Sequence, residues 1–238
     1  MASTWGMQGP TTWSELEARL SGRQPQSSSP SMVRPVVVPE PDRTPTGGTP
    51  RPVVPYAELH CHSHFSFLDG ASHPEELAEE AHRLGLTALA VTDHNGLYGV
   101  VRFAEAARAV GLPTVFGSEI TVQSSTGPQH LVVLADGTAG YARLARALSL
   151  AQLAGSKGDP RCTMPDLDEV GACHWWVLTG CRQGAVPAAL IEHGPSVALR
   201  ELQKLITAFG RDRVLVELWD HGDPLDTARN DAMAELAA

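Results

Sequence analysis

Short apolar runs alternate with amphipathic stretches from Tyr56 to the end of the chain. The runs are rich in Val, Leu, Ile and aromatic residues and are bordered by Gly, Pro or Asp, which is typical of β-strands. They predict strands at Ala57–His62, Ala88–Thr92, Thr114–Ile120, His130–Ala135, Trp175–Thr179 and Val214–Trp219.

The stretches between these runs have apolar residues at helical spacing. In the first of them, Pro74 stands near the expected start and Gly85 at the expected end, where each residue type favours a helix boundary. Strands that alternate with helices usually run parallel, with right-handed crossovers, so the pattern predicts an α/β fold. Further helices are predicted at Leu97–Val110, Ala139–Leu153, Pro187–His193, Ser196–Phe209 and Pro224–Ala237.

Two architectures fit this alternation, an open doubly wound sheet and a closed β/α barrel. An open sheet of the dinucleotide-binding type carries a glycine-rich turn after its first strand. This chain has H-C-H-S-H at that place. Polar residues with metal-binding side chains border nearly every predicted strand, as the catalytic face of a barrel requires. The barrel is therefore the favoured prediction.

The first 55 residues differ from the rest of the chain. Residues 23–55 are crowded with Pro, Ser, Thr and Gly and lack a sustained apolar period, which predicts a disordered linker. Before them, Trp13, Leu16 and Leu20 lie at helical spacing and Gly22 follows, which predicts a short helix. That helix either docks its apolar stripe or forms transiently, since isolated helices of this length are marginal in water. We expect a leader at residues 1–55 and a domain at residues 56–238.

Composition limits the function without assigning it. The 238 residues carry a formal net charge of -9, so the surface as a whole does not have the basic character that holds proteins on nucleic acid. Four cysteines without CxxC spacing favour a reducing compartment. A signal-peptide pattern is absent from the N-terminus, and no apolar run approaches the roughly 20 residues of a membrane helix. A cytoplasmic protein without a membrane partner is expected.

Side chains that bind divalent metals recur at the ends of the predicted strands. His60 and His62 stand at alternate positions, so one face of an extended strand presents both imidazoles. Imidazole is the commonest side-chain ligand of zinc-like ions. Glu119 ends an apolar run, where an unpaired carboxylate is costly to bury and a cation would offset the cost. The candidate ligands are His60, His62, Asp69, His94, Glu119, His130 and Cys181.

Each candidate also has an ordinary structural interpretation. Asp69 precedes Gly70 and suits a turn, and Asp93 suits a helix cap. Cys181 is as readily a small buried hydrophobic residue. His64 continues the alternation and is interpreted as a neighbour of the site or as unrelated to it. A metal site is favoured because these residue types recur in order at successive strand ends, which packing alone does not require.

Taken in order, the motifs resemble a known family. The order H-x-H, Asp, T-D-H, G-x-E, H-L-V-V-L-A and L-T-G-C is similar to that of the PHP (polymerase and histidinol phosphatase) domain. More narrowly, P-Y-A-E-L-H-C-H-S-H-F-S-F-L-D-G-A, L-A-V-T-D-H-N-G-L-Y-G-V-V-R-F and V-E-L-W-D-H-G-D-P-L-D resemble the N-terminal domain of bacterial C-family DNA polymerases, the type of the DNA polymerase III alpha subunit. T-W-S-E-L-E-A-R-L-S-G and the Pro-rich linker favour the error-prone, damage-inducible branch. The resemblance covers residues 56–238 and, more weakly, the leader.

The resemblance implies a distorted seven-stranded, TIM-like β/α barrel with up to three zinc or manganese ions. It implies a parent DNA-directed DNA polymerase, a nucleotidyltransferase that acts on DNA in replication, repair and translesion synthesis, alongside other repair proteins. The domain itself would be a metal-dependent 3′→5′ phosphodiesterase, and thus a hydrolase, or a structural module. His60 and His62 would bind one ion with Glu119. That carboxylate would bridge to a second ion at His130 and Cys181, and a third ion would lie at Asp69 and His94.

The chain departs from the family pattern near its end. The family completes its site with an Asp-x-His after the last strand, and no such motif follows Asp220-His221. We therefore expect a domain truncated before its last strand, with exposed sheet edges and reduced stability. A free-standing, histidinol-phosphatase-like phosphatase and an inactive scaffold are the alternatives. The polymerase-like V-E-L-W-D-H-G-D-P-L-D stretch disfavours the phosphatase, and bound metal would argue against the scaffold.

Overall fold

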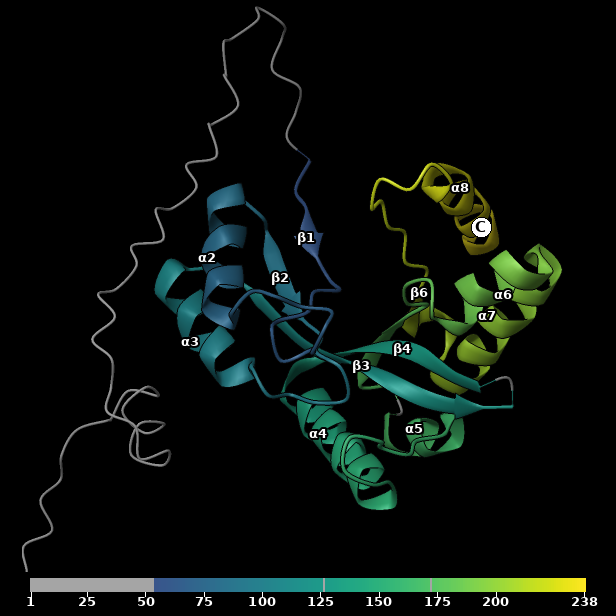
Figure 1. Cartoon of the computed structure of the whole chain (residues 1–238), viewed down its shortest axis with the longest axis horizontal. Helices are drawn as coiled ribbons and strands as arrows, with labels where there is room; N and C mark the ends of the chain where they lie inside the picture. Colours follow the sequence, from purple (N-terminus) through teal and green to yellow (C-terminus); the bar gives the residue numbers. More distant parts are fainter. Residues whose placement is uncertain (1–53, 126, 172) are drawn as a thin grey trace, which may run out of the picture. The chain divides into compact units, whose positions relative to one another are not determined.

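The computed structural model describes residues 54–125, 127–171 and 173–238, which form a sheet curled into half of a barrel (Figure 1). The α/β class and the positions of all six expected strands are confirmed. The leader up to residue 53, with its predicted helix, lies outside the described residues. In sheet order the strands are β1 (Ala57–Glu58), β2 (Ala88–Val91), β3 (Thr114–Ser124), β4 (Gly127–Ala135), β5 (Trp175–Leu178) and β6 (Val214–Leu215).

One strand runs against the prediction. β1, β2 and β3 are parallel, as are β5 and β6, but β4 is antiparallel to both of its neighbours. β3 continues past Ile120 as far as Ser124, and β4 begins at Gly127. A connection this short makes a hairpin, because a parallel neighbour needs a crossover of a dozen or more residues. The expectation of parallel strands throughout is therefore wrong at β4.

Helices cover the outer face of the curled sheet (Figure 1). A single 3-10 turn, η1 (Arg211–Arg213), leads into β6. Within the part of the chain that the structure describes, no helix combines the length and the apolar character needed to cross a membrane. The helices are α2 (Pro74–Leu84) and α3 (Val100–Val110) beside β1 and β2, α4 (Gly137–Ala154) and α5 (Met164–Gly171) beside β3 and β4, and α6 (Ala185–His193), α7 (Pro195–Phe209) and α8 (Asp226–Ala237) near β6.

The two faces of the sheet carry different cores because successive strand residues point to opposite sides. Leu131 and Val133 of β4 belong to the large cluster that includes residues of α4, α5, α6 and α7. Val132 and Leu134 belong to a small apolar cluster on the inner face. Glu119 of β3 is the ladder partner of Val132, so its carboxylate stands on the inner face beside that cluster. The curl thus presents a buried acid to the inside of the half-barrel.

Candidate metal centre

His60 and His62 follow β1 in an extended segment. β1 ends at Glu58, whose Oε1 accepts a hydrogen bond of 3.1 Å from the backbone N–H of His60. The segment remains attached to the end of β2, since the N–H of Cys61 donates to Oγ1 of Thr92 at 3.0 Å and the N–H of Thr92 donates to the carbonyl of Cys61 at 2.9 Å. The regular strand is shorter than predicted, but the alternation still turns both imidazoles toward the inner face.

Glu119 lies at the centre of the site, with a side chain that is 1% exposed. Its Oε2 is 2.6 Å from Nε2 of His60 and 3.7 Å from Nε2 of His62. Its Oε1 is 3.1 Å from Nδ1 of His94 and is in close contact with Nδ1 of His130. Each carboxylate oxygen therefore faces its own pair of imidazoles. This is the arrangement of a carboxylate that bridges two cations.

The atoms around Glu119 approach one another without forming hydrogen bonds. Among the described residues, Nε2 of His60 and of His62, Nδ1 of His130 and both carboxylate oxygens of Glu119 are buried and lack a hydrogen-bond partner. Such atoms are rare because each costs about 1–3 kcal/mol when left unpaired. Nitrogen and carboxylate donors turned toward a common space suit a divalent transition-metal ion. The donor set therefore fits a metal.

Asp69 is shared between two of the histidines. Its Oδ2 lies 2.5 Å from Nδ1 of His62 and 2.9 Å from Nε2 of His94. Each of these histidines thus turns one nitrogen to Asp69 and the other to Glu119, and a neutral imidazole offers only one lone pair. Two ions at Glu119 fit this geometry most directly. Among the described residues, the groups whose donor atoms lie within 4.8 Å of one another are His60–His62–Glu119, His62–Asp69–His94 and His94–Glu119–His130.

Cys181 lies next to His130 but outside these three groups of the described chain. It follows the end of β5, as the sequence predicts. A hydrogen bond to Cys181, together with Glu119, raises the pKa of His130 to about 9. The thiol therefore lies within hydrogen-bonding reach of one imidazole that faces Glu119.

Asp93 supports the turn that follows His62. It is 2% exposed and accepts hydrogen bonds from the N–H of Ser63 at 2.8 Å, from Oγ of Ser63 at 2.7 Å and from Oγ of Ser66 at 2.7 Å. The imidazole of His64 belongs to this turn and packs with its centroid 4.3 Å from that of His73. The alternation of imidazoles therefore stops at His62, because the turn carries the third ring away from the inner face.

The electrostatics of the site depend on the buried acid. Burial alone would lower the pKa of His60, but Glu119 and Glu217 outweigh it and raise that pKa to about 10. Burial disfavours the charged form of Glu119, yet His130, His60 and His94 hold its pKa far below the usual range. Burial lowers the pKa of His62. Without ions, protons on imidazoles balance the carboxylate, and a metal would displace them.

Glu217 is a residue of the site that sequence reasoning missed. Its Oε1 lies 2.7 Å from Nδ1 of His60. It stands in the family-like V-E-L-W stretch, but no motif spacing connects it with the first histidines. Glu217 also lines a cleft of about 940 Å³ beside the candidate ligands, together with Tyr56, Arg182 and Trp219.

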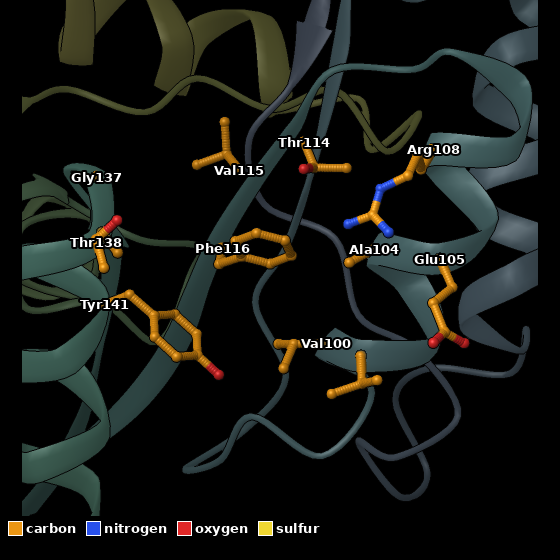
Figure 2. A pocket seen from close by; sticks show the side chains of 12 residues that line it. Val100, Ala104, Glu105, Arg108, Thr114, Val115, Phe116, Gly137, Thr138 and Tyr141 are labelled. Atoms are coloured by element: carbon orange, nitrogen blue, oxygen red, sulfur yellow. The ribbon is translucent and has the colours of Figure 1, made fainter.

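A separate cavity of about 590 Å³ holds none of the candidate ligands (Figure 2). It lies between α3, the start of β3 and the start of α4, and its walls are mainly apolar. Figure 2 shows the rings of Phe116 and Tyr141 on one side and the guanidinium of Arg108 pointing in from the other. The candidate ligands His60, His62, Asp69 and Cys181 line the other cleft instead.

Residues 58–221 match the family described as PHP domain. Error-prone DNA polymerases of Mycolicibacterium paratuberculosis, Cutibacterium acnes and Mycobacterium tuberculosis are 49%, 51% and 48% identical to the chain over 249, 245 and 247 residues. Each alignment covers 96% of this chain but only 22%, 21% and 22% of the polymerase. The chain thus spans about a fifth of the length of these relatives.

A solved structure has a similar fold. It is a protein from Bifidobacterium adolescentis that carries a provisional assignment as a metal-dependent phosphoesterase. The TM-score is 0.53 at 17% identity, with 78% of this chain and 85% of that chain covered. At this identity the likeness establishes the fold and leaves the chemistry to the residues described above.

Proposed function

Because this chain belongs to the PHP domain family, we propose that residues 56–238 are the metal-binding domain of an error-prone DNA polymerase. The support is an identity of 48–51% to three such polymerases across nearly the whole chain. The parent would be a DNA-directed DNA polymerase of the cytoplasm, with DNA and other repair proteins as partners. It would act in replication, repair and translesion synthesis. Residues 1–55 would be the leader that precedes the domain.

Within the domain, Glu119 would bridge two divalent ions. The observation that carries this proposal is a buried carboxylate whose two oxygens face different imidazole pairs. Imidazole and thiolate donors favour zinc, while the carboxylates also suit manganese. Asp69 would orient two of the histidines, or hold a third ion when one of them turns away from Glu119. The ligands would be His60 and His62 for one ion and His94, His130 and Cys181 for the other.

The reaction would be hydrolysis of a phosphodiester at the 3′ end of DNA. Ions held in such a site act as Lewis acids toward phosphoester oxygens. The adjacent cleft has the volume of a small-ligand site. Arg182 is the one Lys or Arg among the described residues that line it, and its guanidinium would hold a phosphate oxygen. Tyr56, which is 57% exposed, offers aromatic surface for a base.

The test uses the metal-loaded chain and a single-stranded DNA oligonucleotide labelled at its 5′ end. Shortening from the 3′ end that a chelator prevents, and that Glu119→Gln abolishes, is the expected result. Asp226→Asn is the matched control, since it neutralises another buried carboxylate, 2% exposed, away from the candidate ligands. A chain that binds two ions and leaves the oligonucleotide intact would be a structural module.

A free-standing phosphatase is the alternative activity. It would release inorganic phosphate from a monoester such as histidinol phosphate without shortening the oligonucleotide. The polymerase relatives, which match 96% of the chain, favour the diester. Comparing monoester and diester turnover by the same preparation separates the two activities.

A further inference from the structure

Glu217 makes an ionic contact that lies outside the three groups of possible metal ligands among the described residues. Its side chain is 12% exposed, and its Oε1 lies 2.7 Å from Nδ1 of His60. Its backbone N–H donates to Oγ1 of Thr179 at 2.9 Å, and the N–H of Thr179 donates to the carbonyl of Leu215 at 3.0 Å. The backbone of Glu217 is therefore tied to the ends of β5 and β6, and its carboxylate lies beside the imidazole.

His60 uses its two ring nitrogens in opposite directions. Nε2 faces Oε2 of Glu119 at 2.6 Å, and Nδ1 faces Glu217 at 2.7 Å. A neutral imidazole carries one N–H and one lone pair, and the partner of one nitrogen decides which is which. A carboxylate at Nδ1 accepts a hydrogen bond and so keeps the proton on that nitrogen. The lone pair of a neutral ring then lies on Nε2 and faces Glu119. Carboxylates placed behind metal-binding histidines orient the ring and increase its basicity.

The same contact joins the two outer strands of the described sheet. β1 and β6 are at opposite ends of the strand order, and each has a ladder partner on one side only. His60 follows β1 by two positions and Glu217 follows β6 by two positions. Their side chains are 157 positions apart in the sequence and meet between the two unpaired edges of the sheet. Unpaired edges are weak points of a sheet.

We propose that Glu217 is a positioning residue that sets the orientation of His60 for metal binding and, through the same contact, clasps the ends of β1 and β6. This inference rests on the proposed metal-binding function. Glu217 is assigned no bond to an ion, since it belongs to none of the three groups among the described residues. Metal loading and closure of the sheet edges are thereby coupled through one imidazole.

The test compares Glu217→Gln and Glu217→Ala with the wild-type chain and with Asp220→Asn. The control makes the same change of charge in the same cleft, and Asp220 is exposed and accepts a bond of 3.0 Å from the N–H of Gly222 within its own turn. Zn²⁺ affinity is measured by competition with a chelator dye. We expect a loss of roughly 10–100-fold for both Glu217 variants and none for Asp220→Asn.

Two further readouts separate a positioning role from other roles. Amide hydrogen exchange should become faster at residues 56–60 and 214–218 in Glu217→Ala, with helices α2 to α4 unchanged. The number of bound Zn²⁺ ions should stay at the wild-type value at saturation. Loss of one ion in Glu217→Gln would identify a ligand and overturn the assignment, as would unchanged affinity.

Failure of the proposed function has a different signature. In that case the wild-type chain binds no Zn²⁺, whereas failure of the clasp leaves wild-type binding intact and exchange at both edges unchanged in Glu217→Ala. Glu217→Gln removes the charge but keeps the side-chain volume and one hydrogen-bond acceptor, so this variant should still fold. Its circular dichroism spectrum verifies the fold.

Discussion

Replacing Glu119 by Gln should remove the stabilisation that the chain gains from divalent metal. The substitution keeps the size of a side chain that is 1% exposed but removes its charge, leaving four imidazoles without their common anion. In metal-free protein, loss of one partner from a buried ionic cluster costs about 3–5 kcal/mol. For the wild type, free metal at 100 times Kd stabilises by about 2.7 kcal/mol per site, so two ions contribute roughly 5 kcal/mol. In Glu119→Gln this gain should fall close to zero.

The assay is urea unfolding followed by circular dichroism, with EDTA and with Zn²⁺ or Mn²⁺ in excess. Asp226→Asn is the control, because this carboxylate is 2% exposed and accepts bonds from the backbone N–H groups of His221 and Asp223. It should lower the unfolding free energy while keeping the whole metal-dependent gain. The reasoning would be refuted by a Glu119→Gln protein that binds two ions and gains as much stability from them as the wild type.

Four further outcomes are expected at the site and at the turn beside it. Loading metal-free protein at pH 7 should release at least two protons, because the imidazoles of His60 and His130, whose pKa values are raised to about 10 and about 9, must each give up a proton to bind an ion. Binding of an ion by Cys181 would release the thiol proton in addition. Calorimetric heats identical in all buffers would contradict this. The same two pKa values lie above the unfolded value of 6.5, so protonated His60 and His130 stabilise the folded, chelator-treated protein. This stabilisation should be complete below pH 6.5 and should be lost as the pH rises through 9 to 10. Unfolding curves measured across that range would detect the loss. Asp93→Ala leaves three donors of Ser63 and Ser66 without their acceptor, so it should lower the unfolding free energy by roughly 3 kcal/mol. Amide hydrogen exchange should also become faster in the turn at residues 63–70. Unaltered protection of that turn would count against the role given to Asp93. Cys181→Ser should lower the affinity for zinc relative to manganese by about tenfold, because a hydroxyl oxygen replaces a soft sulfur donor. An unchanged ratio of the two affinities in a competition titration would show that Cys181 does not coordinate the ion.

The strands and several helix boundaries could be predicted because their signals are local. Apolar runs mark all six strands. Pro74 begins α2, and Gly85 ends it in the left-handed conformation, with a φ of 73° that glycine adopts at little cost. Glu119 was also accessible to sequence reasoning, because a carboxylate at the end of an apolar run needs a partner. Its position on the inner face follows from strand alternation.

The remaining features depend on contacts between distant segments. The direction of β4 is decided by the hairpin at residues 124–127, which extends β3 beyond its apolar run. The role of Glu217 depends on a contact with His60 across the open side of the sheet, and no spacing in the sequence encodes it. The sharing of His62 between Asp69 and Glu119 depends on which ring nitrogen faces which carboxylate. Such choices are made by tertiary packing and not by sequence pattern.

The central claim is that side chains from separate strands converge on Glu119 to hold divalent cations. Anomalous diffraction from crystals of the chain grown with Zn²⁺ or Mn²⁺, recorded on both sides of the metal absorption edge, tests it most directly. The expected result is two peaks, one on each side of the Glu119 carboxylate, with His60 and His62 around one and His94 and His130 around the other. Crystals with metal in the solution but no anomalous peak within bonding distance of Glu119 would contradict it.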